Sequence, residues 1–383
     1  MNYFKILRFV QHGNANYLDI PTEQQAYYIS KLGEPKDDID RSYKQYLCQR
    51  FFEPQWKKAL LDLMSAILFF PTILILFIRG LMVKKCENID AYGSFYGIEE
   101  ILPDELKNKF RIEVRNWDEK KALFKENIKP ILLLFMRHSW SPLFLLKCTI
   151  KLSMYSYIIR SYEPRAIIVH NEPSYTNSFL TMCCEKYGVK HINVMHGEKL
   201  YNIRDSFFRF DEFYVWSNYY IELFKSLNVE MSQMRICIPR SLKIDIKKYI
   251  NPDVYGDFKY FLSIYTEQEI KSIVESMQFV KKQNKTVKYR PHPRYSNISL
   301  LKKYVNESEI EWPQKVGILE SISNLEYAVG SYSTVLTQAY LSGKCVILDN
   351  VTYKLQYEKL KSHKYILSNV GLPTLSHYQQ ECN

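Results

Sequence analysis

Residues 165–197 have the sequence RAIIVHNEPSYTNSFLTMCCEKYGVKHINVMHG, and this stretch decides the fold class. The apolar run Arg165–His170 follows a proline and predicts a buried parallel strand. Thr176–Tyr187 predicts a helix that ends at Gly188, and His191–Met195 predicts the next strand. A strand, a helix and a strand at this spacing indicate a right-handed βαβ unit in a doubly wound sheet.

The same alternation continues toward the C-terminus. Glu212–Trp216 predicts a further strand, and a domain boundary is expected near Val229–Pro239. Tyr260–Ile264 then starts a second series of strands. Glu267–Gln283 predicts a helix because its apolar residues fall on one face. Later elements are expected as strands at Thr286–Tyr289, Tyr327–Gly330 and Cys345–Leu348, and as a helix at Thr334–Leu341 that ends at Gly343.

This order predicts an α/β protein in which two Rossmann-like domains face a cleft. A chain of 383 residues is long enough for two domains. The expected parts are a polar N-terminal segment at 1–58 and an apolar helix at 59–85. A first Rossmann-like domain is expected at 86–232 and a second one at 233–383.

Composition limits the possible partners. The chain is 46% hydrophobic and 24% charged, which is typical of a globular protein, and its net charge is +11. A positive balance favours anionic partners such as nucleotide phosphates or lipid head groups. Its Lys and Arg residues are spread along the chain, without zinc spacings or an aromatic RNA motif, so nucleic-acid binding is not expected. The eight cysteines form no CxxC pair and no secretory signal is evident, so we expect a cytoplasmic protein with reduced thiols.

The most apolar stretch is Ala59–Val83, whose uncharged centre Leu63–Ile78 has the sequence LMSAILFFPTILILFI. This centre is shorter than the roughly 20 residues that a spanning helix needs. Lysine pairs flank both ends, so the charges give no orientation. Three interpretations remain open: a helix at the membrane interface, a buried core helix, or a spanning helix. A second apolar stretch, Ile128–Met136 followed by Trp140–Leu146, could extend a membrane-facing surface.

Two motifs in the second predicted domain carry phosphate chemistry. His292 and Pro293 follow a strand, where the histidine could donate to a phosphate or protonate it as it leaves. Arg290 and Arg294 flank them and add cations that fork onto phosphate oxygens. The second motif, Gly330-Ser331-Tyr332-Ser333-Thr334, ends a strand and opens a helix, whose free N–H groups and dipole favour an anion. Either motif alone also fits a plain loop or a plain helix cap, but together they predict a nucleotide site.

A third motif, Met195-His196-Gly197-Glu198, ends a strand of the first predicted domain. At such a strand end, His196, Glu198 or Glu172 could act as a general base that deprotonates a hydroxyl. Asp205 and Asp211 are weaker candidates. The one DxD spacing, Asp38-Ile39-Asp40, lies in a polar segment without a preceding strand, so no metal site is expected.

The order of these motifs resembles a known group of proteins. The HG, HP and GSxSTxL elements, followed by AxxxGKxVI from Ala339 to Ile347, look like bacterial GT-B glycosyltransferases of surface polysaccharide synthesis. Lys288–Arg294 and Glu320–Asp349 resemble the HP and S-S/T motifs of sialyltransferases and polysialyltransferases. They also resemble elements of CDP-glycerol glycerophosphotransferases and of capsule Kdo transferases. The resemblance covers residues 165–350 and implies a GT-B fold and a cytidine nucleotide.

The resemblance also implies roles for residues. His292 would contact the CMP phosphate and act as acid, while Ser333 and Thr334, with Ser331 adjacent, would hold the phosphate. The acidic base motif of the sialyltransferases has no clear copy here, and His196-Gly197-Glu198 looks closer to the HG of the glycerophosphotransferases.

The function expected from residues and resemblance together is an inverting, metal-independent glycosyltransferase without a cofactor. Its donor would be a CMP-sugar, carrying sialic acid or a related nonulosonate. Its acceptor would be a cell-surface glycan of capsule, lipopolysaccharide or O-antigen, either free or linked to lipid. The alternatives are a CDP-glycerol, CMP-Kdo or UDP-sugar transferase, or a non-catalytic relative that binds nucleotide. The enzyme is expected in the cytoplasm, peripheral on the inner face of an anionic cell membrane.

Overall fold

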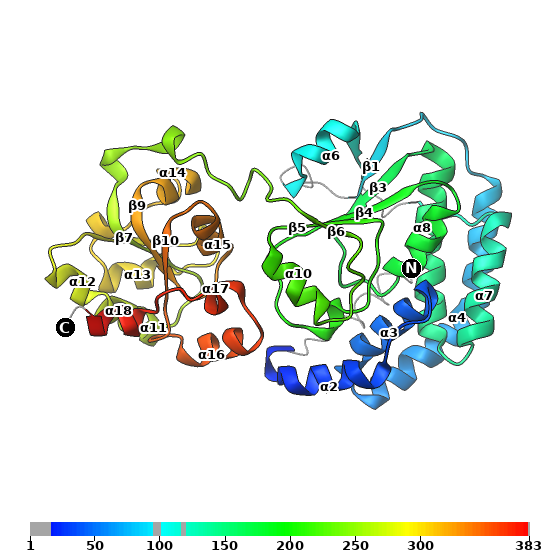
Figure 1. The fold of residues 1–383 in the computed structure, drawn as a ribbon, viewed down its shortest axis with the longest axis horizontal. Coiled ribbons are helices and arrows are strands. Elements are labelled where there is room, and N and C mark those ends of the chain that lie inside the picture. The colour runs from blue at the N-terminus through cyan, green and yellow to red at the C-terminus, as the bar shows by residue number, and fades with distance from the viewer. Residues whose placement is uncertain (1–16, 95–100, 116–119, 382–383) are drawn as a thin grey trace. The chain divides into compact units, whose positions relative to one another are not determined.

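The computed structural model describes residues 17–94, 101–115 and 120–381, which form two compact units (Figure 1). Unit 1 contains the described residues up to His196 together with Tyr201–Ile238. Unit 2 contains Gly197–Leu200 and the described residues from Pro239 onward. Both units are built on parallel sheets, so the predicted α/β class with two Rossmann-like domains is confirmed. Their arrangement around a cleft stays a prediction.

Unit 1 is built on a six-stranded sheet with the order β2-β1-β3-β4-β5-β6, in which every neighbouring pair is parallel. Strand β3 is buried along its whole length, as expected for a central strand covered on both faces. The strands are β1 Ala91–Gly93, β2 Ile112–Val114, β3 Ala166–Val169, β4 Lys190–Val194, β5 Glu212–Val215 and β6 Met234–Ile236.

Helices cover this sheet. One of them, α8, has 21 residues, and most of them are buried. Helices α4, α7 and α9 pack against α8. The helices of unit 1 are α2 Thr22–Leu32, α3 Asp38–Phe51, α4 Gln55–Leu81, α6 Asp104–Lys109, α7 Ile128–His138, α8 Pro142–Tyr162, α9 Asn177–Glu185 and α10 Asn218–Lys225, with short 3-10 turns at Tyr17–Asp19, Lys125–Asn127 and Ile203–Asp205.

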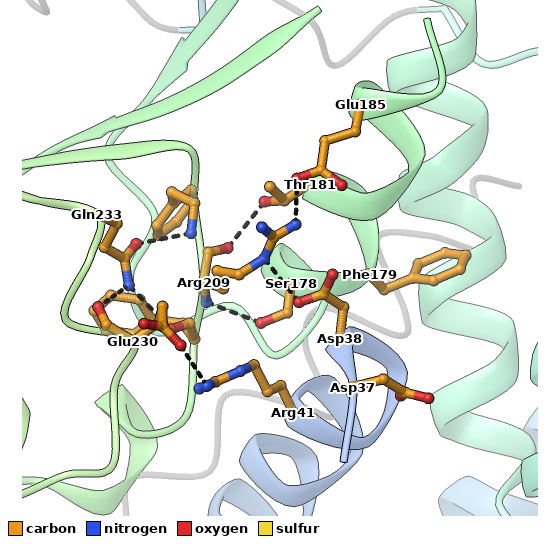
Figure 2. Close-up of polar contacts among 12 residues, drawn as sticks. Asp37, Asp38, Arg41, Ser178, Phe179, Thr181, Glu185, Arg209, Glu230 and Gln233 are labelled. Atoms are coloured by element: carbon orange, nitrogen blue, oxygen red, sulfur yellow. Dashed lines mark hydrogen bonds and ion pairs between the residues drawn. The ribbon is translucent and has the colours of Figure 1, made fainter. Parts of the chain in front are cut away.

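The described part of the polar N-terminal segment belongs to unit 1 and is not a separate part. Helix α3 is joined to α9, because the Phe179 amide donates to Ser42 Oγ at 2.9 Å. Figure 2 shows the polar contacts around it, in which Arg209 pairs with Asp38 at 2.8 Å. The predicted division at residue 58 is therefore corrected: long-range hydrogen bonds that the sequence does not reveal join α3 to the domain.

Unit 2 has a four-stranded parallel sheet with the order β10-β9-β7-β8. Its core includes Phe258 and Tyr260 of β7, Tyr289 of β8 and Val329 of β9. The strands are β7 Gly256–Phe261, β8 Val287–Arg290, β9 Leu325–Gly330 and β10 Cys345–Leu348. The helices are α11 Glu267–Ser276, α12 Gln278–Lys282, α13 Ile298–Tyr304, α14 Ile318–Ser323, α15 Thr334–Leu341, α16 Lys354–Ser362, α17 Ile366–Asn369 and α18 Leu375–Glu381, with 3-10 turns at Ile246–Tyr249, Pro252–Val254 and Glu307–Glu309.

Several predicted boundaries differ from the structure, and three of them are described here. The division expected at residues 232/233 falls after Ile238, because β6 pairs with β5 in the first sheet. The helix predicted at Glu267–Gln283 is interrupted at Met277, whose amide closes α11 by donating to the Ile273 carbonyl. The strand predicted to start at Tyr260 begins four residues earlier, at Gly256.

Two of the described helices, α4 and α8, are long and apolar enough to cross a membrane. The apolar window of α8 is 72% buried inside unit 1, as in the core helix of a soluble protein. The window of α4 is only 22% buried. Helix α4 is therefore unlike a core helix on much of its circumference.

Candidate functional site

The predicted phosphate motifs lie at the same edge of the sheet of unit 2. Strand β7 is flanked by β8 on one side and by β9 on the other. Arg290, the last residue of β8, pairs with Phe261, the last residue of β7. On the other side, a Cβ on Gly330 would lie 3.3 Å from the Phe261 carbonyl oxygen. Strand β8 thus ends on one side of Phe261 and β9 on the other. Such a switch point, where the strand order reverses, is where open α/β sheets bind ligands.

His292 follows β8 and presents one ring nitrogen as a donor. The Arg294 amide donates to its Nδ1 at 3.1 Å, so the neutral ring carries its hydrogen on Nε2. The Ser296 hydroxyl accepts from the His292 amide, and the ring stacks on Tyr295 at 4.5 Å between centroids. Partial burial, together with the Arg294 cation, lowers the pKa of His292. The site therefore favours a neutral imidazole whose Nε2–H can donate.

The two arginines that flank this motif lie in different places. Arg294 is exposed, as is Pro293. Arg290 is only 6% exposed, and its guanidinium donates to Glu311 Oε1 and to the Val316 carbonyl, both at 2.8 Å. The guanidinium of Arg290 is therefore buried and engaged inside the unit, and its contact with a nucleotide stays a prediction.

A third charged side chain completes the buried group below the motif. Lys259 of β7 has no exposed side-chain surface and pairs with Glu311 Oε2 at 2.5 Å. Ser321 also donates to Glu311. Burial lowers the pKa of Lys259, while the Glu311 carboxylate opposes that shift. We call Lys259, Arg290 and Glu311 the buried triad.

The second phosphate motif opens α15. Ser333 is the N-cap, and its hydroxyl accepts from the Val335 amide at 3.2 Å. Thr334 is exposed, and Ser331 is partly exposed with its hydroxyl 3.5 Å from Gln356 Oε1. A capped helix start that carries hydroxyl side chains has the positive end of the helix dipole and suits an anion. The predicted helix is confirmed with its bounds.

The motif at residues 195–198 divides between the units. His196 belongs to unit 1 and Gly197–Leu200 belong to unit 2, and Gly197 has a positive φ of 67°. Tyr365 of unit 2 is buried, which raises the pKa of its hydroxyl well above the ordinary value, and the charge of Glu198 raises it further. The ring of Tyr365 lies 5.2 Å from that of Tyr332. The charge of Glu198 thus acts on Tyr365, within unit 2.

A second group of polar side chains lies at the carboxyl ends of β3 and β4 in unit 1. His170 and His196 follow these neighbouring strands, and their rings are 5.2 Å apart at an angle of 74°. His196 is exposed, whereas Glu172 is only 1% exposed. The Asn171 amide donates to Asn193 Oδ1 at 2.8 Å. An exposed histidine beside a second histidine can accept and pass a proton.

Three site residues escaped the sequence analysis. Ser94 follows β1, which is flanked by β2 and β3 and is thus the switch strand of unit 1; its amide donates to the Ile168 carbonyl at 3.1 Å. Ser263 follows β7, and its carbonyl accepts from Ser296 in the loop after β8 at 2.8 Å. His170 is the third. Their common signal was available: each follows directly, or within two residues, the end of a strand in a parallel sheet.

The remaining acidic candidates are engaged elsewhere. Asp211 accepts from the His191 amide at 2.7 Å, at the start of β4. Asp205 is 5% exposed. Asp38 pairs with Arg209, and Asp40 pairs with Lys44 at 3.3 Å. Within the described residues, no group of three His, Cys, Asp or Glu side chains could hold a metal ion.

Comparisons with known proteins give the following similarities. No protein-family model matches the chain, and no curated protein matches it. Similar solved structures include the wall teichoic acid polymerase TagF, with 12% identity, a TM-score of 0.43 and coverage of 86% of this chain and 88% of that chain.

The UDP-GlcNAc 2-epimerase from Methanocaldococcus jannaschii has 12% identity and a TM-score of 0.41, covering 77% of this chain and 98% of that chain. The glycotransferase of kitacinnamycin has 10% identity and a TM-score of 0.40, with 70% and 81% covered. With scores below 0.5, these likenesses carry no weight for what this chain binds or does.

Proposed function

We propose that this chain is a glycosyltransferase that takes a sugar from a nucleotide-activated donor, whose phosphate binds at the carboxyl edge of the sheet of unit 2. One observation carries the proposal. His292, with its Nε2–H, follows β8, and α15 follows β9. These two strands flank β7, at the switch point of the parallel sheet. The imidazole of His292 and the N-terminus of α15 both offer N–H or O–H groups at this edge of the sheet. Such groups suit a phosphate, because they stabilise the negative charge that develops on it.

The leaving phosphate would be stabilised by hydrogen bonds and by the helix dipole. His292 would donate from Nε2 in its neutral form, because its Nδ1 already accepts from the Arg294 amide. This differs from the acid role that the resemblance implies, since a neutral imidazole is a poor proton donor. Ser331 and Thr334 would add hydroxyls, and Arg294 an exposed cation. Arg290 would act from below, through the buried triad.

The acceptor hydroxyl would be deprotonated by His196 or by Glu198. His196 is exposed and lies beside His170 at the edge of unit 1, whereas Glu198 lies with the donor residues of unit 2. A carboxylate beside the phosphate would repel the donor, so we propose His196 as the base and Glu198 as a positioning residue. Glu172 is too buried to meet an acceptor without movement. No metal or cofactor takes part in the proposed reaction.

For the donor, we propose a CMP-sugar that carries a nonulosonate, on the strength of the HP and S-S/T motifs at His292 and Ser331–Thr334. CDP-glycerol, CMP-Kdo and UDP-sugars are the alternatives. The proposed acceptor is a cell-surface glycan, and the proposed location is the cytoplasmic face of the membrane.

The binding site is tested by calorimetric titration of the full chain with CMP, CDP, UDP and GDP. We expect CMP or CDP to bind, and His292→Ala to weaken that binding by ~10- to 100-fold, the loss of a hydrogen bond to a charged group. The matched control is Lys285→Ala. Lys285 is exposed and lies just before β8, at the opposite edge of the same sheet. Its loss should leave binding unchanged. Equal affinity of the wild type and His292→Ala would overturn the site.

Two further measurements separate the finer parts of the proposal. If only UDP or GDP binds, the cytidine assignment fails while the site stands. Turnover of CMP-sugars by the wild type, lost in His196→Gln and reduced in Glu198→Gln, supports transfer with His196 as base. Binding without any turnover would leave the non-catalytic alternative.

A further inference from the structure

Helix α4 turns an apolar face outward along its whole length. Its outer residues recur every three or four positions, and between 44% and 88% of each side chain is exposed: Trp56, Leu60, Leu63, Ile67, Phe70, Leu74, Ile78 and Leu81. A helix on the surface of a soluble protein normally has polar residues on this side. Here the outer side is as apolar as the inner one.

Helix α7 extends this surface. Ile128, Leu132, Phe135 and Met136 are exposed, and the ring of Phe135 lies 6.1 Å from the rings of both Phe69 and Phe70 of α4. Both helices pack on α8 at the same side of unit 1 (Figure 1). Contiguous apolar surface of this size marks an interaction site. We call the outer sides of α4 and α7 the apolar face.

The contacts of α4 with unit 1 near both ends argue against a spanning helix. Asp62 pairs with Arg50 at 2.8 Å near its start. Near its end, the Leu76 carbonyl accepts from the Leu123 amide at 3.0 Å. A Cβ on Gly80 would lie 2.0 Å from the Leu123 carbonyl oxygen, so the two backbones touch. The inner side of the helix is buried at Lys57, Leu61, Ser65, Phe69 and Leu76. Crossing a bilayer would require breaking all these contacts.

The charges around the apolar face indicate what covers it. Residues 63–86 and 127–162 contain no Asp or Glu. Exposed cations border the face at Arg79, Lys84, Lys125 and Lys129. Trp56 and Trp140 are both exposed, by 69% and 66%, and Trp side chains favour the membrane interface. An apolar centre with a basic and aromatic border matches the acyl and head-group layers of an anionic bilayer.

We propose that the apolar face docks on an anionic lipid bilayer, with α4 lying in the plane of the interface. A second copy of this chain fits less well, because two such faces would bring together borders in which the cations Arg79, Lys84, Lys125 and Lys129 outnumber the exposed carboxylates Glu87 and Glu126. The surface would bind lipid whatever reaction unit 2 supports. Of the three interpretations that the sequence left open for α4, this proposal corresponds to a helix at the membrane interface.

The test is flotation of the full chain with vesicles of phosphatidylcholine, with and without phosphatidylglycerol. We expect binding to the anionic vesicles that weakens with added salt. Phe70→Ser with Leu74→Ser should reduce the partition coefficient by ~100-fold, because each removes an outward apolar side chain. The thermal midpoint should change little, since these side chains are 65% and 63% exposed.

The matched control is Ile250→Ser with Leu355→Ser, which removes two side chains of unit 2 that are 63% and 81% exposed. This variant should float like the wild type. A wild-type chain that does not bind anionic vesicles overturns the proposal. So does a chain that resists extraction from membranes by alkaline carbonate, which would indicate spanning. A dimer that the Phe70 and Leu74 exchanges dissociate, with unchanged flotation, would identify a self-interface instead.

Discussion

The two sheets bury their polar side chains in opposite ways. In unit 1, His191 lies between two hydroxyls, with Tyr155 Oη and Thr181 Oγ1 each 2.8 Å from a ring nitrogen, and all partners are neutral. In unit 2, the buried triad contains two cations and one carboxylate, and a second buried carboxylate, Asp349, accepts from Tyr260 Oη. Arg290, a member of the triad, ends the strand that leads to His292. The difference is that the strands of unit 2 bury an ion-paired group next to the predicted phosphate motif, whereas the group around His191 in unit 1 is neutral.

The largest expected effect comes from breaking the triad. Glu311→Ala should destabilise unit 2 by about 3–5 kcal/mol, because it leaves two buried cations without their shared partner. The measurement is amide hydrogen exchange of β7 and β8, which reports on unit 2 separately from unit 1.

The control for this prediction is Glu309→Ala. Glu309 pairs with Lys281, and their side chains are 24% and 28% exposed. This partly solvated pair should contribute at most about 1 kcal/mol. Equal effects of the two substitutions would contradict the special place given to the triad, and with it the contrast between the sheets.

The neutral network of unit 1 should appear as a dependence of stability on pH. Burial lowers the pKa of His191 from 6.5 to about 3. Between these values the unfolded chain binds a proton that the folded unit does not, so stability falls as pH falls below about 6.5. The loss approaches about 1.4 kcal/mol per pH unit, or about 2 kcal/mol between pH 7 and pH 5.

Hydrogen exchange of β3 and β4 at these two pH values, corrected for the intrinsic rates, measures the effect. His191→Gln keeps a neutral side chain that can still hydrogen-bond and should be less sensitive to pH than the wild type. An unchanged slope in this variant would show that other groups cause it.

The motif that opens α15 should give the smallest effects on stability. Ser333→Ala should cost about 1 kcal/mol, the usual value of an N-cap. Ser333→Asp keeps a good cap and should preserve stability, but its charge should weaken nucleotide binding. Nucleotide binding that is unaffected by Ser333→Asp would remove α15 from the proposed site. Ser331→Ala, whose hydroxyl lies 3.5 Å from Gln356, should change stability by less than about 0.5 kcal/mol.

The sequence predicted β3 and β4 because buried parallel strands are short apolar runs, but it missed the short strands β1, β2 and β6. It predicted α15 with its bounds, since Ser333 and Gly343 mark both ends. It could not predict that Arg290 points inward, because the partner that decides this, Glu311, lies 21 residues away in sequence. It also could not predict that His196 and Glu198 belong to different units, because the sequence pattern does not reveal the positive φ of Gly197 between them.

Helix α4 was ambiguous for a different reason. Periodicity identifies a buried side only by contrast with a polar one, and α4 is apolar on both. Only the contacts of Asp62 and Leu76 with the rest of unit 1 distinguish its inner side. Contacts between distant parts of the chain thus decided each feature that the sequence left open.

The contact between Gly80 and Leu123 has a mechanical consequence. The segment that touches Gly80 is itself bonded to α8, because the Ala122 amide donates to the Ser153 carbonyl at 3.1 Å, and α8 precedes β3. If α4 rests in the plane of the bilayer, unit 1 would be held at one orientation to it, and His170 would stay at one height above the lipid. An acceptor anchored in that bilayer would then need a spacer whose length matches this height.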